Sequence, residues 1–560
     1  MKISGGKEEP ENYEKMKMAA GRNRLKNIWM LSREYGALAG AGGVKDVVSQ
    51  LSETLARWSG RSVHVVLPCY GFIDPAGSGF APLVDPCDSG EMLQCEIDMN
   101  TPDEKIREGV SFFYQKINRV SIYLVDSDRF REKKDVYVYT GEDESRVAWQ
   151  KKSMGHHDYF AMNILLQKSA LELMVLLDQK PDMIHCHDGH TAILPALIRE
   201  YPGYRSYFKG TGCLVTIHNA GVGYHQDVSD LPYAASICGL TENIIEDHLL
   251  DGKFDPFMVA GSYSLLNTVS ENYARELQET EDDELTGWMG HRLLYRQVRI
   301  EGITNGIDPS LFNPSQIDNQ DNFAFDPGNS EDDLEGKKRC KADLLKRLKD
   351  RSLGYGVVQN GHLQIDPEIP LFTFVGRLNE QKGVDVLIDA LEILLQRHTH
   401  SQVLFLGNGD LDIEEKLLDF TGKAHFRGRV CFLKGYSSDL ARKIYSAGDF
   451  FVIPSRYEPC GLTDFIAQLY GNVPIVHHVG GLVKVRDEYS GLAYLDNSTP
   501  GLLTALERGL KLFSDKKKMR KIQVQAITEI EDKYTWSKVM KRYVELYKNA
   551  VAERCRRIRV

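Results

Sequence analysis

The chain has 560 residues, of which 69 are Lys or Arg and 79 are Asp or Glu, so its formal net charge is −10. A hydrophobic content of 42% and a charged content of 26% are typical of a globular protein and exclude a disordered or collagen-like chain. The acidic balance argues against nucleic acid as a partner, because a nucleic-acid carrier would be basic.

The cysteine pattern and the lengths of the apolar segments indicate the cellular compartment of the protein. The ten cysteines include no C-x-x-C pair, which indicates neither a disulfide framework nor a structural zinc site. Residues 1–26 are polar and charged and lack the apolar core of a signal peptide. No uncharged apolar stretch reaches the roughly 18 residues of a membrane span. We therefore expect a cytoplasmic protein without a membrane partner.

Short, β-rich apolar runs recur along the chain, and each is followed by Gly or polar residues and a helix-like segment. Near-continuous apolar runs are typical of parallel strands that are covered on both faces, so the alternation predicts doubly wound α/β domains. The predicted strands are Ile28–Leu31, Val63–Leu67, Val120–Val125, Met183–His185, Leu214–Ile217, Leu371–Val375, Val403–Leu406, Val430–Leu433, Phe450–Ile453 and Val473–Val476. The clearest predicted helices are Ala161–Leu177, Asp385–Gln396 and Asp464–Tyr470.

The alternation breaks once, at Asn313–Glu335, which is polar and acidic and contains Pro and Gly. We interpret this segment as a linker or surface excursion between two α/β domains. Gly42-Gly43 and Gly480-Gly481 each lie beside β-like sequence. The two glycine pairs indicate either two similar domains with matching glycine turns or two unrelated turns. Their positions in the sequence favour neither interpretation.

Polar clusters follow two strands of the first half. His185–His190 reads HCHDGH at the end of one strand, but Asp188 and Gly189 are reversed relative to the metallo-hydrolase pattern H-x-H-x-D-H, and later ligands are missing. Because open α/β sheets bind ligands at the carboxyl ends of their strands, we favour an organic, polyhydroxylated ligand over structural hydrogen bonding or a metal. His218-Asn219 ends the next strand and is also placed for a ligand, but taken alone it is better explained by an Asn turn with a core histidine.

The second half contains a candidate phosphate site. Arg377 and Lys382 follow the strand at Leu371–Val375, and two cations on a loop that enters a helix suit a diphosphate. The alternative is a solvated charged loop. The chain has no G-x-x-x-x-G-K-[ST], which excludes a P-loop nucleotide site of that type. The D-x-D triplet at Asp126–Asp128, a metal–nucleotide signature elsewhere, is too common to indicate a site.

The most specific string is PSRYEPCGLT at Pro454–Thr463, directly after a predicted buried strand. Glu458 can accept hydrogen bonds from sugar hydroxyls. The amide groups at the start of the next helix, those of Gly461, Leu462 and Thr463, can hold an anion. Cys460 is a possible nucleophile, but we interpret it as a small packed residue.

In this order and spacing, the motifs resemble the bacterial glycogen synthase and plant starch synthase family. The similarity runs from about Asn27 to Lys548 and is densest at GAGGVKDV, HCHDGHTA, TIHNAG, ITNGID, VGRLNEQKG, PSRYEPCGLT and VPIVHHVGGL. The resemblance implies a GT-B fold, with two Rossmann-like domains facing a cleft and a last helix that crosses back to the first domain. The implied divisions are an N-terminal extension (1–26), an acceptor domain (27–325), a nucleotide-sugar domain (326–530) and the returning helix (531–560).

The resemblance also implies roles for single residues. Arg377 and Lys382 would neutralise the leaving diphosphate without a metal or other cofactor, and Glu458 would hold the donor glucose. His218 would lie against the reacting sugar, and Asp188 would line the acceptor side. The other implied contacts are His190, Asn219 and Asp46 to substrate, Tyr436 to the base, and Gly42, Gly43, Gly461, Leu462 and Thr463 to the donor phosphates.

The implied activity is glycogen or starch synthesis, in which glucose passes with retention from ADP-glucose to the non-reducing end of an α-1,4-glucan. The chain departs from the family pattern at several positions. Gly40 replaces the usual phosphate-binding Lys, Gly189 replaces a frequent Trp, Asp464 replaces Gln, and Val483-Lys484 replaces Ala-Asp. Alternatives are therefore a synthase that uses UDP-glucose, a GT-B enzyme with another acceptor, or a catalytically weak regulator that binds glucan or nucleotide.

Overall fold

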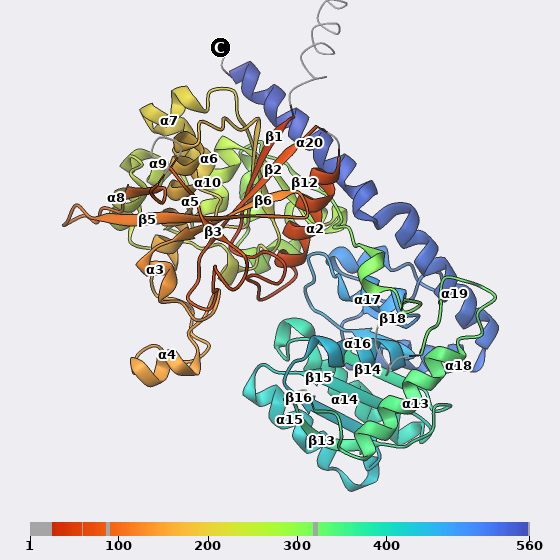
Figure 1. The fold of residues 1–560 in the computed structure, drawn as a ribbon. Helices are drawn as coiled ribbons and strands as arrows, with labels where there is room; N and C mark the ends of the chain where they lie inside the picture. Colours follow the sequence, from red (N-terminus) through yellow and green to blue (C-terminus); the bar gives the residue numbers. More distant parts are fainter. Residues whose placement is uncertain (1–24, 59, 86–89, 317–322, 355, 558–560) are drawn as a thin grey trace, which may run out of the picture. The chain divides into compact units, whose positions relative to one another are not determined.

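The computed structural model describes residues 25–58, 60–85, 90–316, 323–354 and 356–557. Contacts divide the chain into two units (Figure 1), one of which runs to Ile303 and includes Val539–Val560, while the other is Thr304–Lys538. This division comes before the boundary expected at 325, because Ile307 and Phe325 are buried in core clusters of the second unit. The expected extension at 1–26 lies almost wholly outside the described residues.

The first unit is built on a mixed sheet in which the strands from β12 to β6 are all parallel. In sheet order, the strands are β12 (Ile300–Gly302), β11 (Leu265–Thr268), β8 (Gly212–Ile217), β7 (Met183–His187), β1 (Asn27–Leu31), β2 (Ser62–Pro68), β6 (Val120–Asp126), β5 (Arg107–Ile117) and β3 (Ala81–Pro82), with β4 (Gln94–Asp98) paired to β5. A two-stranded sheet contains β9 (Leu249–Leu250) and β10 (Lys253–Phe254).

The five strands predicted in the first half are confirmed as β1, β2, β6, β7 and β8, which are neighbours in this sheet. The antiparallel edge formed by β5, β3 and β4 was not predicted. The helices are α2 (Val44–Arg57), α3 (Asp128–Arg131), α4 (Gly141–Arg146), α5 (Tyr159–Leu176), α6 (Leu194–Glu200), α7 (Pro202–Tyr207), α8 (Leu231–Cys238), α9 (Glu242–Asp247), α10 (Pro256–Tyr263), α11 (Glu271–Glu279) and α12 (Met289–Tyr295).

The second unit has one sheet, parallel except for the edge strand β13. Its order is β13 (Val358–Leu363), β16 (Arg429–Lys434), β15 (Gln402–Gly407), β14 (Leu371–Val375), β17 (Phe450–Ile453), β18 (Val473–His477) and β19 (Leu492–Tyr494). Its helices are α13 (Glu335–Lys349), α14 (Val384–Arg397), α15 (Leu411–Gly422), α16 (Ser438–Ala447), α17 (Thr463–Leu469), α18 (Thr499–Ser514) and α19 (Lys516–Glu529). All five strands predicted in the second half are therefore confirmed.

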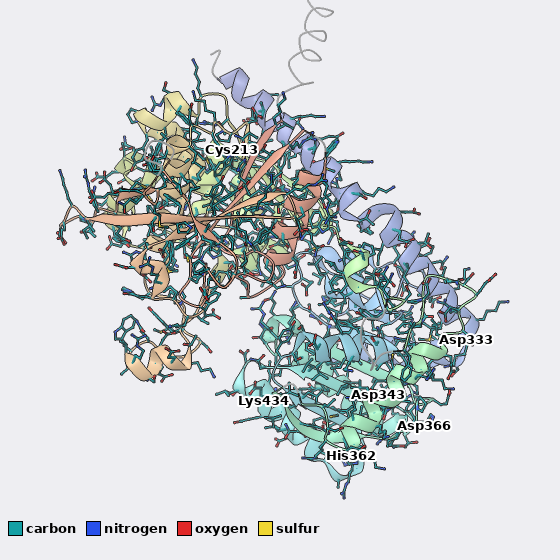
Figure 2. All side chains as sticks on the ribbon, viewed as in Figure 1. Cys213, Asp333, Asp343, His362, Asp366 and Lys434 are labelled. Atoms are coloured by element: carbon teal, nitrogen blue, oxygen red, sulfur yellow. The ribbon has the colours of Figure 1, made fainter. Side chains whose placement is uncertain are left out.

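Side chains fill both faces of the second sheet (Figure 2). Phe372 on β14 stacks on Phe450 on β17, with ring centroids 5.1 Å apart. On the other face, Leu371 and Phe451 belong to a separate buried cluster. The alternation of faces explains the near-continuous apolar runs in the sequence, since neither face of these strands meets water.

The last helix, α20 (Trp536–Arg557), begins in the second unit, and its residues from Val539 belong to the first. The Tyr547 hydroxyl lies 2.8 Å from His185 Nδ1, and His185 Nε2 lies 2.6 Å from Thr216 Oγ1. Thr216 donates in turn to Asn267 Oδ1, so it accepts from His185, and the other ring nitrogen accepts from Tyr547. This buried polar chain joins α20 to β7, β8 and β11, and it confirms the expected return of the last helix.

Among the described residues, we find no helix with the length and hydropathy that a bilayer-spanning segment needs.

The polar chain predicts the effect of Tyr547→Phe. Without the hydroxyl, His185 Nδ1 is a buried acceptor with no donor, which should reduce the free energy of unfolding by about 1–3 kcal/mol. Urea titration followed by circular dichroism measures this change. The control is Tyr295→Phe, because Tyr295 is 87% exposed and its hydroxyl is not buried. Equal stability of both variants would contradict the assignment of this hydrogen bond.

Candidate active site

Two buried histidines meet at the carboxyl ends of β7 and β8 in the first unit. His187 Nδ1 lies 2.9 Å from His218 Nε2. Burial lowers the pKa of His218 to about 3 and lowers that of His187 well below its usual value. The pair is therefore uncharged at neutral pH, and one ring donates to the other.

Asp188 holds the ends of these two strands together. Its Oδ1 accepts the backbone N–H groups of His218 at 2.7 Å and Asn219 at 3.4 Å. Burial raises the pKa of Asp188 to about 7 despite these hydrogen bonds. Its backbone has a φ of 60°, an uncommon conformation for a non-glycine residue, and such conformations cluster at functional sites.

The next residue, Gly189, cannot carry a side chain here without a shift. An added Cβ would lie 2.4 Å from the carbonyl oxygen of His225, a histidine that is fixed by Asp255 and by the carbonyl of Ala220. The neighbouring backbone therefore leaves no room here for the Trp that the family often has at this position.

His190 lies beside a group that the sequence did not single out. Its ring is 5.2 Å from the ring of Tyr137, and Tyr137 donates to Glu34 Oε1 at 2.6 Å. Glu34 Oε2 accepts the amide groups of Ala41 at 2.8 Å and Gly42 at 3.1 Å. Glu34 therefore fixes the glycine turn. The one feature of the sequence that could have indicated Glu34 as a site residue is its position just after the strand Ile28–Leu31.

The glycine turn differs from the family pattern in a defined way. Gly43 precedes the first residue of α2, and nothing lies within 4 Å of a Cβ added at Gly42. A Cβ added at Gly40 would lie 2.3 Å from Lys45 Cδ, so Lys45 occupies the space of a side chain at position 40. The Lys45 amine forms an ion pair with Asp46 at 2.7 Å.

In the second unit, Glu458 and Lys382 form an ion pair between the loops after β17 and β14. Lys382 Nζ lies 2.5 Å from Glu458 Oε2, which also accepts the Ser455 hydroxyl at 3.0 Å. Burial alone would raise the pKa of Glu458, but Lys382 and the hydrogen bonds hold that pKa below its usual value. Glu458 is therefore a mostly buried carboxylate in its ionised form.

The two loops come together because glycines allow close approach. Gly383 has a φ of 63°, and a Cβ there would lie 2.0 Å from the carbonyl oxygen of Pro454. A Cβ at Gly480 would lie 2.0 Å from the carbonyl oxygen of Glu458. The amide group of Gly481 donates to that same oxygen at 2.9 Å. The glycine pair of the second half is thus required by its contact with the turn that carries Glu458.

The other residues predicted in this unit follow strands of the same sheet. Arg377 and Tyr436 come after β14 and β16, and both are exposed, Tyr436 by 68%. Gly461 and Leu462 lead into α17, which begins at Thr463 and has seven residues. Their contacts to a nucleotide stay predictions.

Cys460 is not a reactive thiolate. It is buried, and burial raises its pKa to about 11. Among the described residues, no group of three or more His, Cys, Asp or Glu side chains is placed to hold a metal ion. The HCHDGH string is accounted for by hydrogen bonds, since His185 is bound to Tyr547 and Thr216, and His187 to His218.

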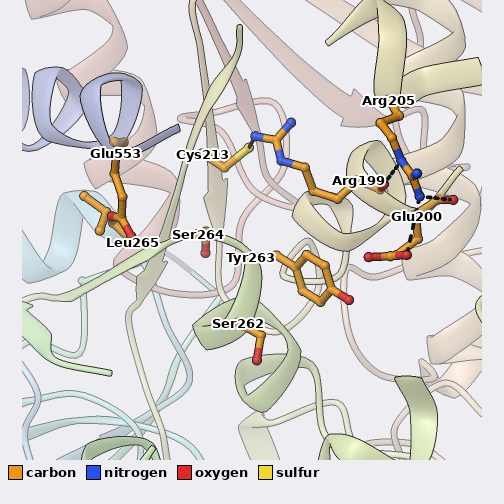
Figure 3. A pocket seen from close by; sticks show the side chains of 10 residues that line it. Arg199, Glu200, Arg205, Cys213, Ser262, Tyr263, Ser264, Leu265 and Glu553 are labelled. Atoms are coloured by element: carbon orange, nitrogen blue, oxygen red, sulfur yellow. Dashed lines mark hydrogen bonds and ion pairs between the residues drawn. The ribbon is translucent and has the colours of Figure 1, made fainter. Parts of the chain in front are cut away.

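A cavity of about 310 Å³ lies elsewhere in the first unit, at the amino ends of β8 and β11 (Figure 3). Arg199 lines it and donates to the carbonyl oxygens of Phe208 and Thr211. Arg205 donates to the carbonyl oxygen of Arg199. The cavity lies at the amino ends of the strands, whereas His187 and Asp188 lie at their carboxyl ends. We therefore do not include it in the candidate active site.

Known proteins match the chain over nearly its whole length. Residues 27–292 match the family described as starch synthase catalytic domain, and residues 369–511 match glycosyl transferases group 1. Glycogen synthases of Syntrophotalea carbinolica and Geotalea uraniireducens are each 29% identical, cover 94% of this chain, and are themselves covered over 99% and 100%.

A solved structure shares the fold. The catalytic domain of starch synthase IV from Arabidopsis thaliana, bound to ADP and acarbose, superposes with a TM-score of 0.73 at 24% identity. The match covers 94% of this chain and 99% of that one. The GT-B fold expected from the motifs is thereby confirmed.

The raised pKa of Asp188 predicts a pH effect on stability. The folded state holds this proton up to about pH 7, whereas the unfolded chain releases it near pH 4. The contribution of Asp188 to stability is thus present below pH 4 and is lost as the pH rises to 7. Relative to Asp188→Asn, the unaltered protein should lose unfolding free energy between pH 4.5 and 7, as measured by urea titration.

The control for this pH series is Asp46→Asn, since Asp46 is a partly exposed carboxylate of the same unit. Its stability should follow that of the unaltered protein at each pH. A constant difference between the Asp188→Asn variant and the unaltered protein across the series would contradict the shifted pKa.

Proposed function

We propose, on the premise that this chain belongs to the glycogen and starch synthase family of glycosyltransferases, that it elongates an α-1,4-glucan. In this reaction, glucose passes with retention from a nucleoside diphosphate glucose, with ADP-glucose preferred, to the non-reducing end of the chain. The choice of donor and acceptor is supported by the Arabidopsis thaliana relative, whose structure holds ADP and acarbose.

One observation carries the proposal, namely the partly buried ion pair between Glu458 and Lys382, whose side chains are 11% and 22% exposed. A buried ionised carboxylate is an acceptor for the hydroxyl groups of a sugar, and an adjacent ammonium group is a partner for phosphate. Both groups lie where the loops after neighbouring strands β14 and β17 meet. Ligands of open α/β sheets bind at this edge.

In the proposed reaction, Lys382 and Arg377 stabilise the charge that develops on the leaving diphosphate. Glu458 orients the donor glucose through its hydroxyl groups. The leaving phosphate takes the proton from the acceptor hydroxyl as the new glycosidic bond forms on the same face. Side-chain acid–base chemistry is then small, and the rate depends mainly on positioning.

The first unit supplies a polar surface for the acceptor, in which the two histidines are uncharged. His187 and His218 are neutral, and Asp188 is tied to backbone amide groups. Neutral imidazole rings exchange hydrogen bonds with sugar hydroxyls without the cost of desolvating a full charge. We assign Asn219 and His190 to the same acceptor surface.

A second candidate function is a catalytically weak regulator that binds glucan or nucleotide. The observation that favours it is the glycine turn of the first unit, where position 40 has no side chain and Lys45 is paired with Asp46. This turn therefore offers a phosphate group one cation fewer than the family pattern does. Binding of both ligands without turnover would support this candidate over the synthase.

The synthase proposal predicts release of ADP when the protein is mixed with glycogen and ADP-glucose. Lys382→Ala should reduce kcat/KM by about 100-fold or more, because it removes a donor to the leaving group and leaves Glu458 unpaired. A coupled assay for nucleoside diphosphate measures the activity of the unaltered protein and of the variant. UDP-glucose is run in parallel to identify the donor.

The matched control is Lys423→Ala, which breaks a half-exposed ion pair with Glu392 on the helical layer of the same unit. Its activity should be close to that of the unaltered protein. No release from either donor by the unaltered protein, under conditions where a known glycogen synthase turns over, would defeat the proposal.

A further inference from the structure

A second lysine is buried near Glu458, and the proposed reaction does not use it. Lys484 Nζ lies 3.1 Å from Asp464 Oδ2, and the two side chains are 5% and 0% exposed. The same ammonium group donates to the carbonyl oxygens of Gly461 at 2.7 Å and Gly481 at 3.1 Å, and also to that of Cys460. One cation thus faces three carbonyl oxygens and one carboxylate.

These partners come from three different segments. Cys460 and Gly461 belong to the turn that carries Glu458, Gly481 belongs to the short 3-10 segment Gly480–Lys484, and Asp464 lies in the first turn of α17. The carbonyl oxygens converge with their negative ends on one point, which is unfavourable without a cation between them. Lys484 is therefore the group that allows these segments to pack together.

The packing around the ammonium group leaves little freedom. Gly461 has a φ of 71°, and an added Cβ would lie 2.8 Å from Leu482 Cδ2 and 3.4 Å from Lys484 Nζ. Lys484 also helps Lys382 to keep the Glu458 carboxyl ionised. Four charges consequently alternate through this cluster, in the order Lys382, Glu458, Lys484 and Asp464.

We propose that Lys484 and Asp464 are positioning residues of the donor site, which hold the Glu458 turn in the conformation that binds a nucleoside diphosphate glucose. This inference rests on the proposed function. Without Lys484, three backbone carbonyl groups lose a donor and the Asp464 carboxylate is buried without a partner. The turn would relax, and Glu458 and the backbone of Gly461 would move away from their positions.

The same unit provides a matched pair with no part in this site. Lys341 Nζ lies 2.6 Å from Asp449 Oδ2 and also donates to the carbonyl oxygen of Ile369. Both side chains are mostly buried, at 3% and 15% exposure. Asp449 and Ile369 come just before β17 and β14. This pair therefore lies at the amino ends of the strands, whereas Glu458 follows the carboxyl end of β17.

The test compares Lys484→Met with Lys341→Met in the full chain. Both variants should lower the thermal midpoint, since each leaves a buried carboxylate unpaired. Only Lys484→Met should raise the KM for the nucleotide sugar, with a loss of about 100-fold in kcat/KM and an unchanged KM for glycogen. An equal effect of the two variants on the donor KM, or no effect of either, would overturn the proposal.

A double variant tests whether the two residues act as a pair. Lys484→Met with Asp464→Asn should be more active than Lys484→Met alone, because the unpaired carboxylate is removed. Lower activity of the double variant than of the single one would count against the coupling.

If Lys484→Met does not fold, Asp464→Asn and Asp449→Asn give the same comparison with smaller changes in shape. Asp464→Asn should weaken donor binding by several-fold and Asp449→Asn should not. Equal donor KM values for the two would overturn the proposal.

Calorimetric titration with ADP and with UDP separates this inference from the proposed function. If the unaltered protein binds one of these nucleotides but shows no turnover, the synthase proposal fails. The positioning role of Lys484 can then still be tested through the affinity for the nucleotide. Weaker nucleotide binding by Lys484→Met than by Lys341→Met then supports the role, and equal binding contradicts it.

Discussion

The need to keep the mostly buried carboxylate of Glu458 ionised constrains the loops that follow β14, β17 and β18 in the second sheet. A buried charge persists only when it is paired and hydrogen-bonded, and Lys382, Ser455 and Lys484 meet that need here. Bringing these groups together forces backbone segments into contact. The glycines at 383, 480 and 481 are a consequence, because a Cβ at any of them would lie about 2 Å from a carbonyl oxygen.

In contrast, three histidines on or next to β7 and β8 in the first unit are buried without charge. His185, His187 and His218 are all kept neutral by burial and are linked by hydrogen bonds to neighbouring strands or to α20. Asp188 ties the ends of β7 and β8 together through backbone amide groups. A polar surface fixed in this way loses little conformational freedom when it binds hydroxyl groups, which suits a neutral glucan.

The sequence predicted the buried strands because parallel strands covered on both faces need apolar residues at nearly every position, as at Leu371–Val375. It did not predict β5, in which only Val110 and Phe112 are buried, or the three-residue strand β12. The HCHDGH and EPCGLT strings identified residues that the structure brings to strand ends. Glu34 and Tyr137 escaped prediction because their pairing joins residues far apart in the chain. The meeting of Asp464 and Lys484 was equally hidden, although both positions had been noted as departures from the family.

The central claim is that the Glu458–Lys382 pair is the donor site of a glucosyltransferase. A crystal structure of the protein with bound ADP-glucose tests it most directly. The account predicts glucose hydroxyl groups within hydrogen-bonding distance of the Glu458 carboxylate and the diphosphate against the Lys382 ammonium group. Well-defined nucleotide density elsewhere, with the ion pair between these two residues still closed, would contradict it.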